Sequence, residues 1–182
     1  MDSAEIVSDG LSRINRILHR ALEGVPVDAL NRLPVPHANS MSWLAWHLTR
    51  VQDHHISDLV GVPQLWISDK WHERFGMAAD ETETGTGHTP QQVGALQVES
   101  ADVLLGYTDA VLARGVEYLK GVTPKGLDAE IDEPQYDPLP TVGVRLVSIL
   151  GDNLSHAGQV AYLRGYFEGL GWLGVSADRG VA

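Results

Sequence analysis

The stretch GDNLSHAGQVAYLRG, residues 151–165, lies inside a segment whose spacing of apolar residues predicts a long helix. Thr141 is a suitable N-cap for this helix, and the sequence GLG at 169–171 is expected to end it near Glu168. It is one of four substantial helices that the sequence predicts. Together these helices favour an all-α fold, a four-helix bundle.

The other helices follow from the same periodicity. The first is expected from Ser3 to Glu23 and the second from Met41 to Leu59. Thr89 begins another, with Pro90 at its first position, and helix is expected to continue to Lys120 with room for a break. No segment alternates polar and apolar residues as a strand would. We therefore expect one domain over residues 1–182.

Three irregular segments join these helices. Residues 63–76, PQLWISDKWHERFG, are expected to form one or two short helical turns. Residues 78–88 are acidic and rich in Gly and Thr, so we expect an exposed, mobile loop. Residues 121–139 lose the helical pattern and predict a long connection.

Composition excludes several classes of function. The net charge of −11, without any basic run, argues against nucleic acid as a partner. No apolar run is long enough to span a bilayer, and the amphipathic N-terminal segment is unlike a signal peptide, so we expect a cytoplasmic protein without membrane contact. The absence of cysteine excludes disulfides, thiolate metal sites and a cysteine nucleophile. Any thiol chemistry would need a thiol from outside the chain.

Polar residues interrupt the apolar stripe of the last predicted helix. Asp152 and His156 share a face with Ile149, Val160 and Leu163, so the pattern predicts that both are buried. They are one turn apart, about 6 Å along the helix axis. Both side chains can therefore aim at a common point.

A buried carboxylate at Asp152 needs a partner, because an unpaired buried charge costs several kcal/mol. The partner could be the imidazolium of His156, the guanidinium of Arg145, or a metal ion. An ion pair that only satisfies itself in the core is the common outcome in helical proteins. The last helix alone does not decide between these alternatives.

The second predicted helix adds another buried histidine. His47 lies between Leu44 and Val51 at helical spacing, so it is expected to face the core. His47, Asp152 and His156 would then form a set of two histidines and one carboxylate, which suits a divalent ion. Bundle cores often assemble metal sites from facing helices in this way.

Further residues are candidates for substrate binding. One histidine falls near the same face seven residues after His47, and a glutamine one turn beyond His156 could hydrogen-bond a metal ligand. Each candidate also has an ordinary structural interpretation, either an exposed side chain or packing in the core. The substrate-binding candidates are His54, Arg145, Gln159, Trp66 and Trp71.

Four motifs, in this order, resemble those of the DinB-like superfamily: HANSMSWLAWHLTRVQDHH at 37–55, LWISDKWHERFGM at 65–77, GHTPQQV at 87–93 and LGDNLSHAGQVAYLRG at 150–165. The sequence looks most like the actinobacterial branch, related to mycothiol-dependent maleylpyruvate isomerase and the thiol S-transferases. The resemblance covers nearly the whole chain and implies a four-helix bundle.

The resemblance also implies a divalent metal, zinc, nickel or iron, held by His47, Asp152 and His156. Many members carry a third histidine where this sequence has Asp152; the isomerase type has a longer carboxylate there. The implied cofactor is mycothiol or another low-molecular-weight thiol, activated by the metal for attack on a small-molecule substrate. Thiol transfer to an electrophile, or isomerisation through a thiol adduct, is the leading functional hypothesis.

Two other functions remain open at this point. In one, the bundle holds no metal, Asp152 and His156 form a buried ion pair, and the chain binds a ligand or a protein partner. In the other, the two-histidine, one-carboxylate set holds non-haem iron that activates oxygen. A homodimer is a further expectation, because bundles with spare apolar surface often pair.

Overall fold

The structure is a computed structural model, and it describes residues 1–173. Four long helices dominate it, in agreement with the helices that the sequence predicts. The long connection after residue 120 contains a further short helix, and the helix expected from 90 to 120 is broken at 96–100. The elements are α1 Ser3–Leu22, α2 Val27–Asn31, α3 Met41–Val60, α4 Leu65–Ser68, α5 Trp71–Arg74, α6 Pro90–Ala95, α7 Ala101–Leu119, α8 Pro124–Leu127, α9 Val142–Glu168 and the 3₁₀ turn η1 Leu170–Leu173.

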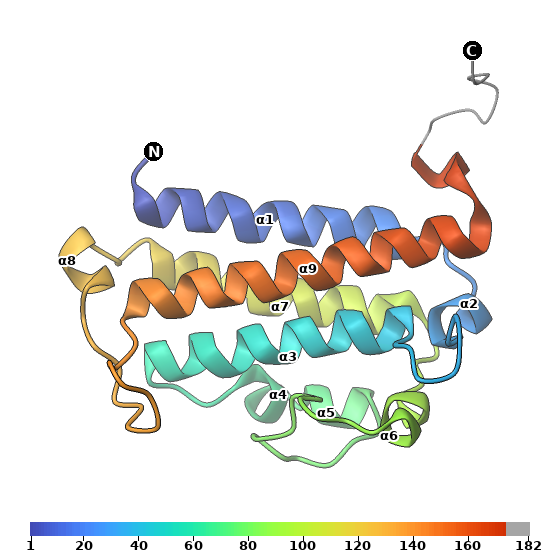
Figure 1. The fold of residues 1–182 in the computed structure, drawn as a ribbon, viewed down its shortest axis with the longest axis horizontal. Helices are drawn as coiled ribbons and strands as arrows, with labels where there is room; N and C mark the ends of the chain where they lie inside the picture. Colours follow the sequence, from blue (N-terminus) through green and yellow to red (C-terminus); the bar gives the residue numbers. More distant parts are fainter. Residues whose placement is uncertain (174–182) are drawn as a thin grey trace.

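The long helices form a four-helix bundle. α9 packs against both α1 and α3, and α7 packs against the same two helices from the other side. Figure 1 shows α1 and α9 running in one direction along the bundle, with α9 between α1 and α3. The short helices α4, α5 and α6 lie beyond α3, at the lower edge of the view. All described helices fall short of the length and apolarity needed to cross a membrane.

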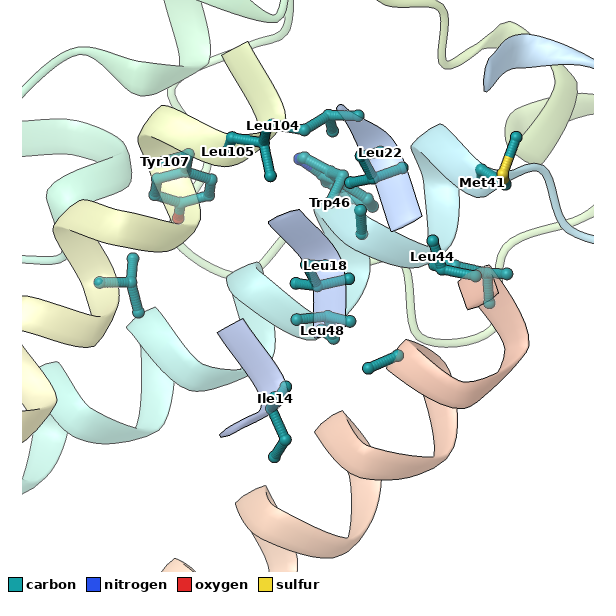
Figure 2. Close-up of a cluster of buried hydrophobic side chains, with 14 of the residues drawn as sticks. Ile14, Leu18, Leu22, Met41, Leu44, Trp46, Leu48, Leu104, Leu105 and Tyr107 are labelled. Carbon is teal, nitrogen blue, oxygen red and sulfur yellow. The ribbon is translucent and has the colours of Figure 1, made fainter. Parts of the chain in front are cut away.

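The core explains why the helices meet along these faces. Apolar residues at three- and four-residue steps on α1 meet bulky side chains of α3 and α7, as Figure 2 shows. Burial of this kind contributes about 25 cal/mol per Å² of apolar surface removed from water. The labelled members of the cluster are Ile14, Leu18, Leu22, Met41, Leu44, Trp46, Leu48, Leu104, Leu105 and Tyr107.

Side-chain caps begin the helices where the sequence predicts them. The hydroxyl of Thr89 accepts a hydrogen bond from Gln92 N, and Gln92 Oε1 accepts one from Thr89 N, which completes a capping box. Thr141 caps α9 by accepting from Val144 N, and Gly169 follows its last residue. The only β pairing in residues 1–173 is an isolated bridge, so the all-α prediction is confirmed.

The segment 78–88 differs from its prediction. Gly85 is buried at its centre, and the segment lies against the side of α3 through main-chain hydrogen bonds to His47 and Arg50. The expectation of an exposed loop is therefore wrong for its middle part. Gly and Thr residues there allow a close approach to α3, which composition alone did not reveal.

Candidate metal centre

The contact between α3 and α9 brings three predicted ligands together. One ligand atom each from His47, Asp152 and His156 lies within 4.8 Å of the others. The imidazole ring centroids of His47 and His156 are 5.0 Å apart, and His156 Nε2 lies 3.5 Å from Asp152 Oδ1. His47 is buried as predicted, whereas Asp152 and His156 are half-buried at the edge of the packed face. The shorter carboxylate of aspartate therefore still reaches the two imidazoles.

Hydrogen bonds fix which nitrogen each histidine presents. His47 Nδ1 donates to the main-chain carbonyl of Thr84 at 2.5 Å, and His156 Nδ1 donates to Gln159 Oε1 at 2.7 Å. In the neutral form of each ring the proton is on Nδ1 and the lone pair is on Nε2; a protonated His156 instead donates from Nε2 to Asp152. Outer partners of this kind orient histidine ligands in metal sites. The role expected for Gln159, a hydrogen bond to a ligand, agrees with this geometry.

The Asp152 carboxylate has an unused acceptor. Asp152 Oδ2 is buried and has no hydrogen-bond partner within residues 1–173. A buried carboxylate oxygen without a donor is costly, and a cation would remove that cost. The donor set of two imidazoles and one carboxylate therefore fits a divalent metal ion.

Electrostatics couples the three side chains. Burial alone would raise the pKa of Asp152, but the hydrogen bond from His156 and the charges of His156, His47 and His55 together lower it. The same hydrogen bond raises the pKa of His156, against the effect of burial. Burial lowers the pKa of His47, which keeps its imidazole neutral and able to ligate.

A buried arginine holds the segment that carries Thr84. Arg50 on α3 has no exposed surface and donates from Nε to the carbonyl of Glu83 at 2.9 Å and from Nη2 to the carbonyl of Glu81 at 3.1 Å. These bonds place the neighbouring carbonyl of Thr84 over His47. The sequence analysis missed Arg50, because an arginine in a helix usually indicates a solvated position.

A buried aspartate balances this arginine. Asp53 Oδ2 lies 3.4 Å from Arg50 Nη1, and its oxygens also accept from the main-chain nitrogens of Leu65 and Trp66 at the start of α4. The hydroxyl of Tyr107 donates to Asp53 at 2.7 Å. One ion pair thus ties α3, α4, α7 and the segment 78–88 together. Asp53 was also missed from the sequence.

Aromatic packing holds the other end of the segment. His88 accepts a hydrogen bond from Trp43 Nε1 and stacks on Trp46, with ring centroids 5.9 Å apart. Trp43 in turn stacks on His47 at 4.7 Å. The sequence analysis assigned His88 to a loop without further role; the structure makes it an anchor of that loop.

A cavity opens beside the candidate ligands. It has a volume of about 450 Å³, and threonine hydroxyls, histidines and α9 residues line it. Such a volume suits a small molecule. Its lining residues are His47, Val51, His54, His55, Thr82, Thr84, Thr86, Ser148 and Asp152.

Comparison with known proteins agrees with this architecture. The sequence model of the DinB superfamily matches residues 11–160. The chain belongs to the DinB superfamily. A crystal structure described as the conserved protein of a locus from Enterococcus faecalis is 33% identical, with a TM-score of 0.83, and the match covers 91% of this chain and 96% of that one. A comparison with curated proteins finds no match.

A second histidine cluster contributes to the same cavity. Ligand atoms of His54, His55 and Asp58 lie within 4.8 Å of one another. Gln64 Oε1 accepts from Arg50, so its amide nitrogen faces His54 Nδ1 at 2.9 Å and donates to it. His54 then carries its proton on Nε2, 3.4 Å from Asp58. A neutral His54 in this state has no free lone pair for a metal.

The sequence left Arg145 open as a possible partner of the Asp152 carboxylate, and the structure pairs it with a different residue. Arg145 pairs with Glu133 in the connection before α9, and it lies 3.3 Å from His55 Nε2. Burial first, and then the positive charge of Arg145, lower the pKa of His55 to about 4. Arg145 is therefore the partner of Glu133 rather than of Asp152. His55 also lines the cavity.

The two tryptophans proposed for substrate binding lie away from the cavity. Trp66 is fully buried against Trp46 and Tyr107, and Trp71 is buried against Tyr107. Neither lines the cavity beside His47. Tertiary contacts bury both indoles in the core, so neither is placed to bind a substrate in this cavity.

Proposed function

We propose that this DinB-superfamily chain is a metal-dependent enzyme whose divalent ion is held by His47, Asp152 and His156. The buried oxygen Asp152 Oδ2, which lacks any donor within residues 1–173, is the observation that carries the proposal. The outer hydrogen bonds that leave Nε2 of both histidines available support it. Three protein ligands leave a coordination position open, as catalytic sites require.

The reaction we propose is transfer of a low-molecular-weight thiol to an electrophile, or isomerisation through a thiol adduct. A divalent ion bound there supplies Lewis acidity that lowers the pKa of a thiol beside it. In the transfer, the thiol would release its proton to solvent, its sulfur would form a bond to an electrophilic carbon, and the bond from that carbon to the leaving group would break, with the leaving group keeping the electron pair.

The residues of the chain would hold the reactants in the adjoining cavity. His54 offers an Nε2–H donor at its edge, and the hydroxyls of Thr86 and Ser148 line it. These neutral groups suit a ligand rich in acceptor oxygens. We propose mycothiol or a related thiol as the cofactor, a cytoplasmic location where such thiols stay reduced, and a homodimer.

Elemental analysis of untagged protein tests the metal site. We expect near-stoichiometric zinc, nickel or iron in the wild type, and loss of that metal in both His47→Ala and His156→Ala while the circular dichroism stays helical. His72→Ala, a histidine on α5 outside the cluster, should keep its metal. Wild-type protein that is empty and takes up no added metal would contradict the proposal.

A metal-free binding module is the second candidate. The direct approach of His156 Nε2 to Asp152 Oδ1, at 3.5 Å, is the observation that favours it, because the two could simply pair. Thermal unfolding with and without chelator separates the candidates, since a metal that binds only the folded state raises its stability. An iron-loaded protein that consumes oxygen would instead favour the non-haem iron function.

A further inference from the structure

The outer side of α9 carries no charge. The structure describes every residue of this helix, and its charged side chains are half-buried or lie at its last turn. Figure 1 shows α9 at the front of the bundle with its outer side toward the viewer. From Val144 to Tyr166 the exposed residues of α9 are Val144, Val147, Ser148, Gly151, Leu154, Ser155, Gly158, Gln159, Tyr162 and Tyr166.

Large apolar side chains are exposed along this face. Val147 is 65% exposed, Leu154 56% and Tyr162 72%, and Tyr162 stacks on Tyr166. Soluble monomers rarely expose a continuous row of such side chains, and interface centres lack charge and are rich in tyrosine. The face therefore has the composition of a protein interface.

The charge of the chain restricts where a second copy can bind. The net charge of −11 makes two copies repel each other wherever acidic surfaces meet. An uncharged face is the place where two such copies can approach with least repulsion. A different partner, selected to bind an acidic protein, would be expected to meet complementary charge instead.

The order of side-chain sizes along α9 supports the same occupant. Gly151 and Gly158 are equally far from the point between Leu154 and Ser155, and so are Val147 and Tyr162. A two-fold axis at that point would place Val147 opposite Tyr162, Gly151 opposite Gly158, and Leu154 opposite the small Ser155. An added Cβ at either glycine would meet nothing within 4 Å in the monomer, so monomer packing does not require these glycines.

We propose that α9 packs against α9 of a second copy, antiparallel, about a two-fold axis between Leu154 and Ser155. This names the surface of the homodimer proposed above and rests on that proposal, but not on the metal chemistry. Such a contact is isologous, as in most homodimers. The glycines let the two helix axes come within the 8–10 Å typical of packed helices.

The arrangement would bring the second copy to the cavity. Ser148 lines the cavity beside His47 and also belongs to the uncharged face. In the antiparallel register, Tyr162 of the partner subunit lies opposite Val147 and next to Ser148. The rim of each cavity would then include an aromatic side chain from the other copy.

Sedimentation velocity and light scattering test the face. We expect wild-type protein to be dimeric, and Leu154→Lys to raise the dimer dissociation constant about 30-fold or more, as for a residue at an interface centre. Val62→Lys is the matched control. Val62 is also exposed but lies outside α9, next to Pro63, whose carbonyl accepts from Arg114 on α7. Equal effects of the two substitutions would overturn the proposal.

Single cysteines test the register, because the chain has none of its own. With chelator present, mild oxidation should join two copies of Ser155→Cys, which lies at the axis. Ser148→Cys should stay unlinked, because its two copies would be separated by about 20 Å along the helices. If the wild type is dimeric but Ser148→Cys cross-links, or neither variant does, the homodimer stands and this surface is overturned. A monomer at about 100 µM overturns both.

Discussion

Gly85 lies so close to Trp46 that a Cβ added to the glycine would be 2.6 Å from Cζ3 of the indole. The backbone of Gly85 has φ of +86°, a region that favours glycine. The residue before it carries the carbonyl that accepts from His47. The position of a ligand-orienting carbonyl thus depends on a glycine that fits against a tryptophan.

Gly85→Ala should therefore destabilise the protein and weaken metal binding. Gly87→Ala is the control, because Gly87 has φ of +80° and nothing within 4 Å of an added Cβ. Backbone strain of about 1–2 kcal/mol is common to both substitutions, and overpacking adds about 1–3 kcal/mol only at Gly85. Urea unfolding measures the loss of stability, and chelator competition measures the loss of metal affinity. Equal losses in the two variants would show that the Trp46 side chain moves to make room for the added methyl group.

Arg50→Met should cost more stability than any exposed arginine substitution. It removes the nearer of the two arginines beside Asp53, leaving Arg114 at 3.7 Å, and it removes the donors to the carbonyls of Glu81 and Glu83, so we expect a loss of about 3–5 kcal/mol. Arg13→Met, in an exposed pair with Asp9, should cost far less than Arg50→Met. Urea unfolding of both variants checks this difference, and a small loss at Arg50 would contradict it.

The fold could be read from the sequence because its signals are local. Apolar spacing and caps such as Thr89 and Thr141 act within one or two turns, so the helix bounds agree within a few residues. The segment 78–88 was misjudged because its packing depends on partners far along the chain, Trp46 and Arg50. Composition does not record such contacts.

The second histidine cluster should hold no metal. In His156→Ala, we expect metal content to fall to zero rather than to a residual fraction bound by His54 and Asp58, because Gln64 donates to His54 Nδ1. His54→Ala should leave the metal content at the wild-type level. Elemental analysis of the two variants decides this. Metal that is retained in His156→Ala but lost in His54→Ala would place the ion in the second histidine cluster.

The His19 imidazole should give stability that depends on pH. Burial lowers its pKa, but hydrogen bonds to Asp109 on α7 and to Glu23 outweigh this and raise it above 6.5. A raised pKa means that the stabilisation is complete below about pH 6.5 and is lost as pH rises through the folded-state value.

We expect His19→Gln to be less stable than the wild type by about 0.2–1 kcal/mol at pH 5.5. The difference should shrink by pH 8.5. Urea unfolding at both values measures it. A difference that grows with pH would show that the imidazole is bound in its neutral form.

The candidate site was only partly predictable. Helical spacing placed His47, Asp152 and His156 on facing surfaces, and the structure brings them together. The groups that orient them were hidden for different reasons. The partner of His47 is a main-chain carbonyl, which every residue possesses, and Arg50 is a charged residue in a position that helical pattern assigns to the core.

The segment over the site is held to α3 by main-chain atoms. The carbonyls of Glu81, Glu83 and Thr84 accept the bonds from Arg50 and His47, whereas Thr82, Thr84 and Thr86 line the cavity. Replacing those threonines would change the shape and polarity of the cavity without removing a bond that positions His47. The residues that shape the cavity are therefore separate from the atoms that position His47. Selection or engineering could change which small molecule the cavity binds while the candidate metal-binding side chains stay in place.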